Sequence, residues 1–498
     1  MAIEGMAQDD PNKLTVIIVG LGIAGLSVAI ECHSKGHNVK VFEKYEELKQ
    51  MEGDGISIGS NGARVTAKWG DGAFHESIRP LEFQTNRAKV FDYTGYCYGT
   101  FELHGYNEGR GYTVNRGALV SAMHQYAQSL GIPITLGSGV TKYWETEDEA
   151  GIEVNGKKIS ADCVVCAEGI HSQGRLSITG QQMSLQETGY AASRGYLDAR
   201  VAARNPSLSW ILSEEQSGSE DCIYGWLGPG VHFGITTKKK DNELFCLGDR
   251  IDMMLHLQTA STPSQSDDET MNQILQCMDG WAVRDQLEAV IKGVMSGRFI
   301  SENLAIRTPL TTWLSPKRRM IVVGDAAHAA LPSSGQGGTQ AIEDAATLAI
   351  ALDLAGKRDV PLALSVTEKI RYQRAQIVQQ GGLAVLQFVM NHVDFDALRQ
   401  DPTMVKPPHP AWILDHDCQE YASREFSKVA EAVQSGQEYV PHNIPSDGQY
   451  RMEYDILPTD SPTAEYLDIQ SNEDLLGFSI PTICFTAIYA FIAMVYNQ

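Results

Sequence analysis

Residues 14–25 read LTVIIVGLGIAG, and this stretch decides the fold because a β-branched run leads directly into the spacing G-x-G-x-x-G. The run predicts a strand, the apolar spacing over residues 24–35 predicts a helix, and residues 38–42 predict a second strand. Neither strand shows the polar alternation of a sheet with one wet face, so we expect both faces to be covered. A strand, a helix and a strand within about thirty residues form the βαβ unit that begins a Rossmann fold.

The glycines of this stretch predict a dinucleotide site. Gly20, Gly22 and Gly25 follow a strand and precede a helix, which lets the backbone approach a pyrophosphate at the helix N-terminus. Glu43 ends the second strand, where its carboxylate can accept hydrogen bonds from ribose hydroxyls and would repel a 2′-phosphate. The site therefore suits FAD or NAD as the resident dinucleotide rather than NADP.

A second glycine-rich segment, residues 324–338, follows a strand predicted at 320–323. Asp325 stands at the end of that strand, where it could hold another ribose. A helix is predicted next, and its positive end can face an anion such as reduced flavin. The glycines that open this helix are Gly335, Gly337 and Gly338. We interpret His328 as a hydrogen-bonding residue that orients the loop rather than as a titrating group.

The rest of the chain adds a second kind of sheet. Aromatic and Thr-rich strands are predicted around residues 88–101, and consecutive strands with Gly-Pro turns from 189 to about 248 indicate a mostly antiparallel sheet. We therefore predict an α/β protein: a Rossmann-type FAD-binding domain with an inserted, mostly antiparallel β-sheet substrate domain and C-terminal helices. The FAD-binding domain is expected over residues 12–84, 106–182 and 298–380, the substrate domain over 85–105 and 183–297, the C-terminal helices over 381–437, a linker over 438–474 and a hydrophobic tail over 475–496.

Composition and the chain ends limit the partners. Lys and Arg number 40 against 62 Asp and Glu, for a net charge of −22, so repulsion disfavours a nucleic-acid partner. The start of the chain carries no leader pattern, so we expect a cytoplasmic protein. Residues 475–496 are uncharged and as a helix would span about 30 Å, which makes them a candidate membrane anchor, although Pro481 interrupts them. A packed terminal helix and a docking segment for a partner protein are the alternatives.

The two glycine segments resemble those of the class A flavin-dependent monooxygenases, the salicylate and para-hydroxybenzoate hydroxylase type, and the resemblance covers residues from about 14 to 425. Residues 324–345 are similar to the second FAD motif of that family, whose Asp contacts the FAD ribose and whose glycine turn lies at the isoalloxazine. Residues 161–175 resemble the third motif, which normally carries Asp-Gly and serves both FAD and the nicotinamide cofactor. Glu168 replaces that Asp here, so the resemblance does not fix its contacts.

The same resemblance implies further site residues. Arg116 opens a helix that contacts the FAD, and Gly55 and Ser57 lie in the loop that passes near the isoalloxazine. Asp54 sits in that loop, where it would donate or accept a proton.

Two more residues match positions that lie at the substrate in related fungal enzymes, namely Arg194 and Tyr224. Arg194 would hold the substrate or stabilise developing negative charge, and Tyr224 would hydrogen-bond the substrate.

The chemistry is expected to centre on FAD. A single complete G-x-G-x-x-G leaves no second Rossmann domain for a permanently bound nicotinamide cofactor, and no metal-ligand pattern appears, so no metal is expected. The resemblance implies a monooxygenase in which NAD(P)H, with NADPH favoured, reduces the flavin transiently. Molecular oxygen then forms a flavin C4a-hydroperoxide that delivers one oxygen atom to an electron-rich aromatic carbon.

The substrate follows from a narrower resemblance. Residues 39–47 and 53–65, with Arg194 set in Ser-Arg-Gly, are most similar to fungal secondary-metabolism enzymes that epoxidise the C2–C3 bond of an indole in alkaloid biosynthesis. We therefore expect an indole alkaloid as the substrate. Two alternatives stay open: ring hydroxylation of a phenol or aromatic acid, which would favour a cationic pocket, and an FAD-dependent oxidase that inserts no oxygen.

Overall fold

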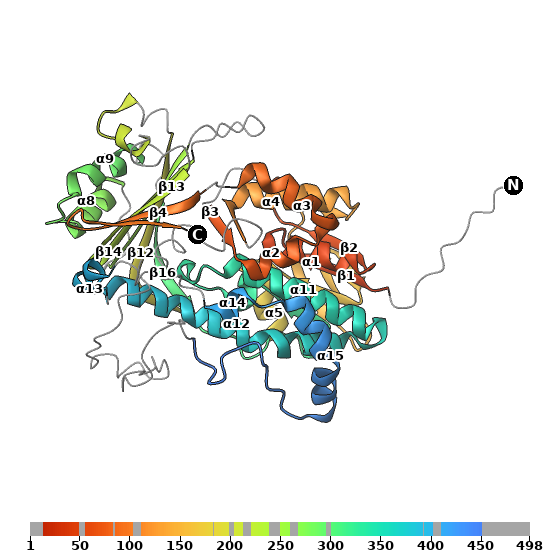
Figure 1. The fold of residues 1–498 in the computed structure, drawn as a ribbon. Helices are drawn as coiled ribbons and strands as arrows, with labels where there is room; N and C mark the ends of the chain where they lie inside the picture. The colour runs from red at the N-terminus through yellow and green to blue at the C-terminus, as the bar shows by residue number, and fades with distance from the viewer. Residues whose placement is uncertain are drawn as a thin grey trace.

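The computed structural model describes residues 13–48, 55–82, 85–102, 111–182, 184–198, 204–212, 221–238, 250–258, 267–294, 300–391, 393–401 and 410–450 (Figure 1). Two predictions fall outside these residues, namely the role of Asp54 and the membrane anchor at 475–496. Among the helices within the described ranges, none is long and apolar enough to cross a membrane. The C-terminal anchor stays a prediction.

The first sheet is parallel, with the strand order β17-β11-β1-β2-β7. Its strands are β1 (Thr15–Val19), β2 (Asn38–Phe42), β7 (Ile134–Thr135), β11 (Cys163–Cys166) and β17 (Met320–Val322). The strands predicted at 14–19, 38–42 and 320–323 are confirmed as β1, β2 and β17. The α/β class is confirmed with them.

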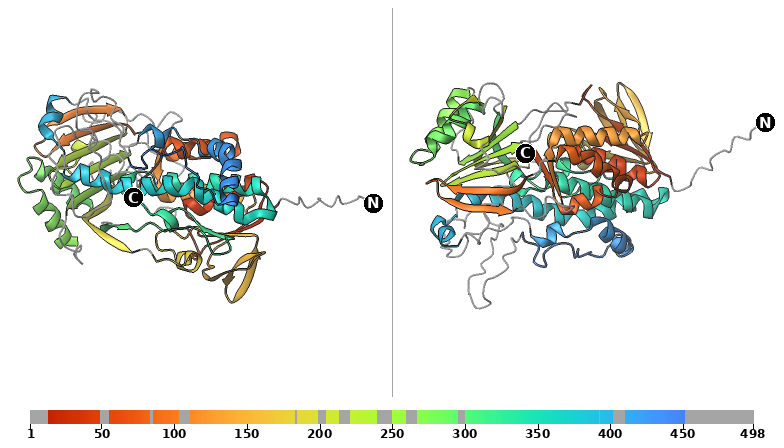
Figure 2. Two further views of the ribbon diagram at one scale, coloured as in Figure 1. Left: turned by 90° about the horizontal axis from the view of Figure 1, so that it is seen from below. Right: turned by 45° about the horizontal axis from the view of Figure 1, so that its top comes forward.

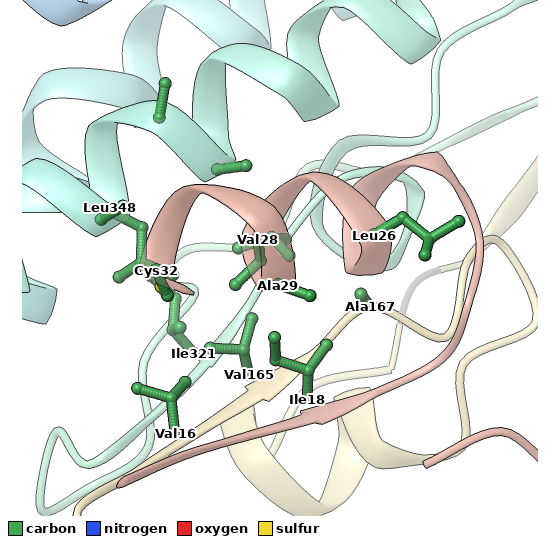
Figure 3. Packing of buried hydrophobic residues seen from close by; sticks show 14 of the residues in the cluster. Val16, Ile18, Leu26, Val28, Ala29, Cys32, Val165, Ala167, Ile321 and Leu348 are labelled. Carbon is green, nitrogen blue, oxygen red and sulfur yellow. The ribbon is translucent and has the colours of Figure 1, made fainter. Parts of the chain in front are cut away.

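The strands β1, β11 and β17 are buried on both faces, as the sequence predicts, whereas β2 exposes Asn38 and Lys40 on one face. The helices on one face are α1 (Ile23–Ser34) and α11 (Gly337–Ala355). Figure 3 shows Val28 of α1 and Leu348 of α11 on the same side of the sheet as Ile18 of β1. Ile17 points to the opposite face and is also fully buried. An antiparallel sheet of β8 (Val140–Glu145), β9 (Ala150–Val154) and β10 (Lys157–Ala161) contacts β1 and β11.

The carboxyl ends of four strands meet at one edge of the parallel sheet. Gly20 follows β1, Glu43 follows β2, Glu168 comes two residues after β11, and Asp325 comes three residues after β17. β2 lies on one side of β1 and β11 on the other, so the strand order changes direction at β1. In open α/β sheets, ligands bind outside such a switch point. The fold therefore gathers the predicted cofactor residues of both glycine segments at one place.

A two-stranded antiparallel ribbon stands beside the start of α11. Its strands are β3 (Gly55–Ile58) and β6 (Tyr112–Asn115), and the helices that follow them are α2 (Ser60–Thr66) and α4 (Arg116–Ser129). Gly59 N, just after β3, donates a hydrogen bond to Thr339 Oγ1 of α11 at 3.1 Å. The ribbon thus joins the N-terminal half of the site to the second glycine segment.

The second sheet has seven strands in the order β16-β12-β15-β14-β13-β4-β5. They are β4 (Thr85–Asp92), β5 (Cys97–Glu102), β12 (Leu185–Asp198), β13 (Asp221–Gly228), β14 (Val231–Lys238), β15 (Arg250–Gln258) and β16 (Ile300–Arg307). Only the β13–β4 pair is parallel, so the prediction of a mostly antiparallel sheet is confirmed. The helices α8 (Asp267–Cys277) and α9 (Arg284–Val294) pack on one of its faces around Ile274 and Leu287.

One long helix, α12 (Val360–Asn391), runs alongside both sheets (Figures 1 and 2). It packs on α11 near its start, and close to its end Met390 O accepts a hydrogen bond from Gly230 N in the β13–β14 turn. The helix continues through residue 380, where the sequence suggests a domain boundary. The remaining helices described are α3 (Ala73–Ile78), α5 (Gly174–Thr179), α10 (Asp325–His328), α13 (Phe395–Gln400), α14 (Ala411–Leu414) and α15 (Cys418–Ser435).

Candidate cofactor and substrate site

In the first glycine turn, Gly20 and Gly25 are packed tightly against neighbouring backbone, whereas Gly22 faces open space. Gly20 has φ +104°, and a Cβ there would lie 2.3 Å from Ala167 O. A Cβ on Gly25 would lie 2.0 Å from Gly20 O, so α1 can approach the turn only because Gly25 lacks a side chain. A Cβ on Gly22 would meet nothing within 4 Å. Gly22 therefore leaves open the space in front of the α1 N-terminus, where a pyrophosphate would bind.

Glu43 closes one side of this turn. Its Oε2 accepts a hydrogen bond from Leu21 N at 2.8 Å, and its Oε1 accepts one from Tyr45 N at 3.0 Å. The side chain is buried, so these two bonds hold the carboxylate in a fixed orientation. Each carboxylate oxygen has a further lone pair, so Glu43 can also accept hydrogen bonds from ribose hydroxyls.

The second glycine segment presents a carboxylate and a helix end to the same edge. Asp325 opens α10 and is exposed. Gly335 has φ +62°, a left-handed conformation that favours glycine at this turn. A Cβ on Gly337 would lie 3.9 Å from Asp325 Oδ1, and one on Gly338 would lie 3.0 Å from Ile56 Cδ1. The N-terminus of α11 has no side-chain cap, so its first N–H groups can face an anion.

These features fit FAD. The bare turn at Gly22 suits the pyrophosphate, the carboxylates of Glu43 and Asp325 suit ribose hydroxyls, and the uncapped N-terminus of α11 suits the negative charge of a reduced flavin. The N-terminus of α1 likewise carries no side-chain cap.

His328 plays the structural part that the sequence suggests. Its Nε2 lies 2.6 Å from Asp344 Oδ2, which also accepts a hydrogen bond from Gly324 N at 2.9 Å. Burial alone would raise the pKa of Asp344, but His328 and Arg371 outweigh it and hold that pKa below its ordinary value. The ionised Asp344 therefore fixes the backbone just before Asp325.

The longer side chain of Glu168 forms hydrogen bonds within the loop that follows β11. Its Oε2 accepts hydrogen bonds from Ser172 Oγ at 2.9 Å and from Gly174 N, at the start of α5, at 2.6 Å. Arg175 then ties this loop to the second glycine segment, because its Nε donates to Ala326 O at 2.6 Å. The Glu in place of the family Asp is thus committed to holding the loop.

The remaining predicted cofactor residues lie on the ribbon. Gly55 pairs with Asn115 across β3 and β6, which brings it next to Arg116, the first residue of α4. Arg116 is exposed. Ser57 is buried, and its Oγ lies 2.8 Å from Thr113 Oγ1. Ser57 therefore stabilises the ribbon internally.

Arg194 lies on β12 of the second sheet and pairs with a carboxylate. Its Nη1 is 3.2 Å from Glu302 Oε2 on the neighbouring strand β16. The Arg194 side chain is 18% exposed and that of Glu302 is 59% exposed. The guanidinium is therefore held largely within the protein while its partner reaches solvent, and the net charge of the pair is close to zero.

Tyr224 lies on the opposite face of the same sheet. The cross-strand row of Arg194 runs through Met254 and Gly234 to Gly225, so Tyr224, the neighbour of Gly225, must point the other way. Tyr224 is fully buried in the cluster beneath α8 and α9 and stacks on Trp226, with ring centroids 6.3 Å apart. The expectation that Arg194 and Tyr224 meet at one substrate is therefore corrected.

Sequence reasoning did not identify a group of buried polar residues behind the second glycine segment: Asn61, Gln336, Gln340, Arg371 and Arg374. They surround Glu343 and Asp344 of α11. The available signal is the pair of adjacent acids within the otherwise apolar run AIEDAATLAI at 341–350. A polar pair at such a position predicts a buried partner of opposite charge.

The chain matches proteins that bind FAD. A family model described as an FAD binding domain matches residues 112–381, and a second model of that description matches residues 15–51. FAD-dependent monooxygenase okaB of Penicillium ochrochloron is 75% identical over 454 residues, which cover 91% of this chain and 99% of that protein. Notoamide E oxidase notB of Aspergillus sp. (strain MF297-2) is 37% identical, over 90% of this chain and 97% of that protein.

Solved structures agree with these relatives. The crystal structure of CtdE in complex with FAD and substrate 4 superposes with a TM-score of 0.76 at 39% identity, covering 85% of this chain and 100% of that one. The crystal structure of FqzB gives a TM-score of 0.76 at 38% identity, covering 88% of this chain and 98% of that one. Asperlicin C monooxygenase of Petromyces alliaceus is 38% identical, over 89% of this chain and 95% of that protein.

Proposed function

Because this chain belongs to the FAD-dependent monooxygenases, we propose that it inserts one atom of molecular oxygen across the indole C2–C3 bond of an alkaloid, giving an epoxide. Two of its relatives are named for the compounds asperlicin C and notoamide E, which supports a small molecule as the substrate.

The ion pair of Arg194 with Glu302 is the observation that favours a neutral substrate over an anionic one. Its N···O distance of 3.2 Å lets the carboxylate offset the guanidinium charge. A phenolate or an aromatic acid would need a cation without such a partner, because burying an unpaired anion is costly. An indole is neutral and needs no counter-charge. We therefore favour indole epoxidation over hydroxylation of a phenol or aromatic acid.

Bound FAD supplies the electrons and the oxygen-activating chemistry. The turn Gly20–Gly25 would hold its pyrophosphate, Glu43 and Asp325 its hydroxyl groups, and the start of α11 its negative charge. The protein itself positions the substrate and excludes water. Arg194 would orient the substrate and stabilise developing negative charge, with Glu302 holding the guanidinium in place.

We further propose that Asp54 moves a proton at the substrate and that NADPH is the transient electron donor. Asp54 directly precedes β3 in the sequence, and in the resembling family this segment passes near the isoalloxazine. The sequence has one complete G-x-G-x-x-G, so the donor would bind and leave rather than occupy a Rossmann domain of its own.

The deciding experiment offers the purified holoenzyme indole alkaloids, phenols and aromatic acids in parallel, with NADPH and ¹⁸O₂, and measures product masses. We expect one labelled oxygen atom in an indole product and one NADPH consumed per turnover. Labelled phenolic products would instead support the ring hydroxylase. Hydrogen peroxide without incorporated label would show an oxidase and overturn the proposal.

Substitutions at the ion pair test the role of Arg194. Arg194→Ala should lower product formation by about a hundredfold or more while FAD stays bound. Glu302→Gln is the matched variant: it keeps Arg194 and removes the carboxylate charge beside it, so binding of anionic aromatic acids should improve relative to indoles. Unchanged turnover in Arg194→Ala would refute the assignment.

A further inference from the structure

Behind the second glycine segment, two acids and two arginines form a buried charged cluster. Glu343 and Asp344 lie in α11, Arg371 and Arg374 lie in α12, and all four side chains are 0% exposed. Arg371 Nε donates to Asp344 Oδ1 at 2.9 Å and its Nη1 donates to Glu343 Oε2. Burial by itself would raise the pKa of Glu343, but Arg374 and Arg371 outweigh it and hold that pKa well below its ordinary value. The four groups are therefore charged and balanced.

Arg374 is fixed by its full set of hydrogen bonds. Its Nε donates to Glu343 Oε2 at 2.8 Å and its Nη2 to Glu343 Oε1 at 3.0 Å. The other three N–H groups donate to the carbonyl oxygens of Trp412, Ile413 and Asn443, each at 3.0 Å. All five donors of the guanidinium are used, so Glu343 is held against a rigid partner.

Each of the two acids is linked to one end of the second glycine segment. Asp344 fixes Gly324 N, just before Asp325. Glu343 reaches the other turn through two amides: Asn61 Nδ2 donates to Glu343 Oε1 at 2.6 Å and to Gln336 Oε1 at 3.0 Å. Gln336 stands between Gly335 and Gly337, immediately before α11. The cluster thus connects to both ends of the second glycine segment.

The orientations of the amides follow from Arg371, which can only donate. Its Nη2 donates to Gln340 Oε1 at 2.7 Å, so Gln340 Nε2 must be the group that donates to Gln336 Oε1 at 3.3 Å. Two buried atoms are then left without a hydrogen-bond partner among the described residues, Asn61 Oδ1 and Gln336 Nε2. Such atoms cost stability, and an apolar pair of similar size would avoid that cost. The hydrogen bonds that these two amides do make link Glu343 and Gln340 to the turn before α11.

We propose that Asn61 and Gln336 are positioning residues of the flavin site. They transfer the fixed position of Glu343 to the turn Gly335–Gly338, so that the N–H groups at the start of α11 stay aimed at the bound cofactor. Gly59 and Thr339 brace the same turn from the ribbon through a 3.1 Å hydrogen bond. Neither amide is assigned a contact with substrate, so both act through the backbone that they hold.

The test uses apolar replacements of similar size, Asn61→Leu and Gln336→Met. The control is Thr347→Val, because Thr347 is also buried and its Oγ1 lacks a partner among the described residues. Apoprotein melting temperature, FAD affinity from quenching of flavin fluorescence, and the visible circular dichroism of bound FAD are measured for each variant.

For Asn61→Leu and Gln336→Met we expect an FAD affinity about tenfold weaker and an altered flavin dichroism, both beyond any change that follows the apoprotein melting temperature. Thr347→Val should keep the affinity and the dichroism of the parent protein. Unchanged FAD affinity and dichroism in both test variants would overturn the proposal. A loss of FAD affinity that only parallels a lower melting temperature, in all three variants alike, would also overturn it. None of these readouts involves a substrate, so the result is independent of the proposed epoxidation.

Discussion

Replacing Gly25 with Ala should break the first glycine turn and FAD binding with it. The new Cβ would lie 2.0 Å from Gly20 O and 3.5 Å from Ala167 Cβ. Ordinary contact begins at 3.4 Å, so α1 and the turn must separate by about 1.4 Å. Gly20 cannot move away, because it is packed against Ala167: a Cβ built on Gly20 would lie only 2.3 Å from Ala167 O. The movement must therefore occur at the N-terminus of α1.

The size of the effect follows from that displacement. A hydrogen bond of about 2.9 Å between the helix N-terminus and a pyrophosphate would lengthen beyond the hydrogen-bonding range. Losing two such bonds to a charged group, at about 1.5–3 kcal/mol each, would weaken FAD binding by about 10²- to 10⁴-fold. The same overpacking should lower the free energy of unfolding of the apoprotein by about 1–3 kcal/mol.

Isothermal titration of the apoprotein with FAD measures the affinity, and urea unfolding measures stability. Gly139→Ala is the matched control, since a Cβ there would lie at an ordinary 3.7 Å from Lys44 Cβ. Gly22→Ala separates the two effects: it should leave the apoprotein stable and still weaken FAD binding. An FAD affinity of Gly25→Ala equal to that of the control would refute this prediction.

Three further substitutions test other parts of the structure. Tyr224→Phe should keep turnover within about twofold, because Tyr224 lies on the face opposite Arg194; a loss like that of Arg194→Ala would contradict the register. Burial and Arg374 hold the pKa of His416 at about 3, below the unfolded value of about 6.5, so only the unfolded chain gains a proton as pH falls. His416 should therefore lower stability by about 1.2 kcal/mol between pH 6 and pH 5 in urea titrations, and His416→Phe should remove that part of the drop. Arg175→Met should lower the free energy of unfolding by about 1–3 kcal/mol, because it leaves buried carbonyl groups such as Ala326 O without a donor; an unchanged urea midpoint would argue against that.

Local pattern was enough to predict the cofactor half of the protein. The run at 14–19 and the spacing of Gly20, Gly22 and Gly25 lie within one βαβ unit, so the strand, the helix and the turn are all short-range features. Asp325 came from the same logic, since it follows a buried strand and the carboxyl ends of parallel strands share one edge.

The substrate half was harder, because the face of a sheet on which a side chain lies depends on pairing between distant strands. Arg194 and Tyr224 are thirty positions apart on strands separated by β15 and β14, and a shift of one residue in any pairing exchanges the faces. The buried polar residues behind the second glycine segment were missed for a related reason. Asn61 bonds to Glu343 across 282 positions of the chain, and a charged residue in a helix is ordinarily taken as solvent-exposed.

The single helix α12 contacts both halves of the enzyme and so fixes the distance between them. Arg371 of α12 donates a hydrogen bond to Asp344 of α11. Met390 O, nineteen residues or about 28 Å further along α12, accepts a hydrogen bond from Gly230 N in the β13–β14 turn. Inserting one residue between Arg371 and Met390 would advance the far end of α12 by about 1.5 Å and turn it by about 100°, so the two hydrogen bonds could not form at the same time. The number of helical residues between these two contacts therefore sets the distance from α11 to the β13–β14 turn of the second sheet.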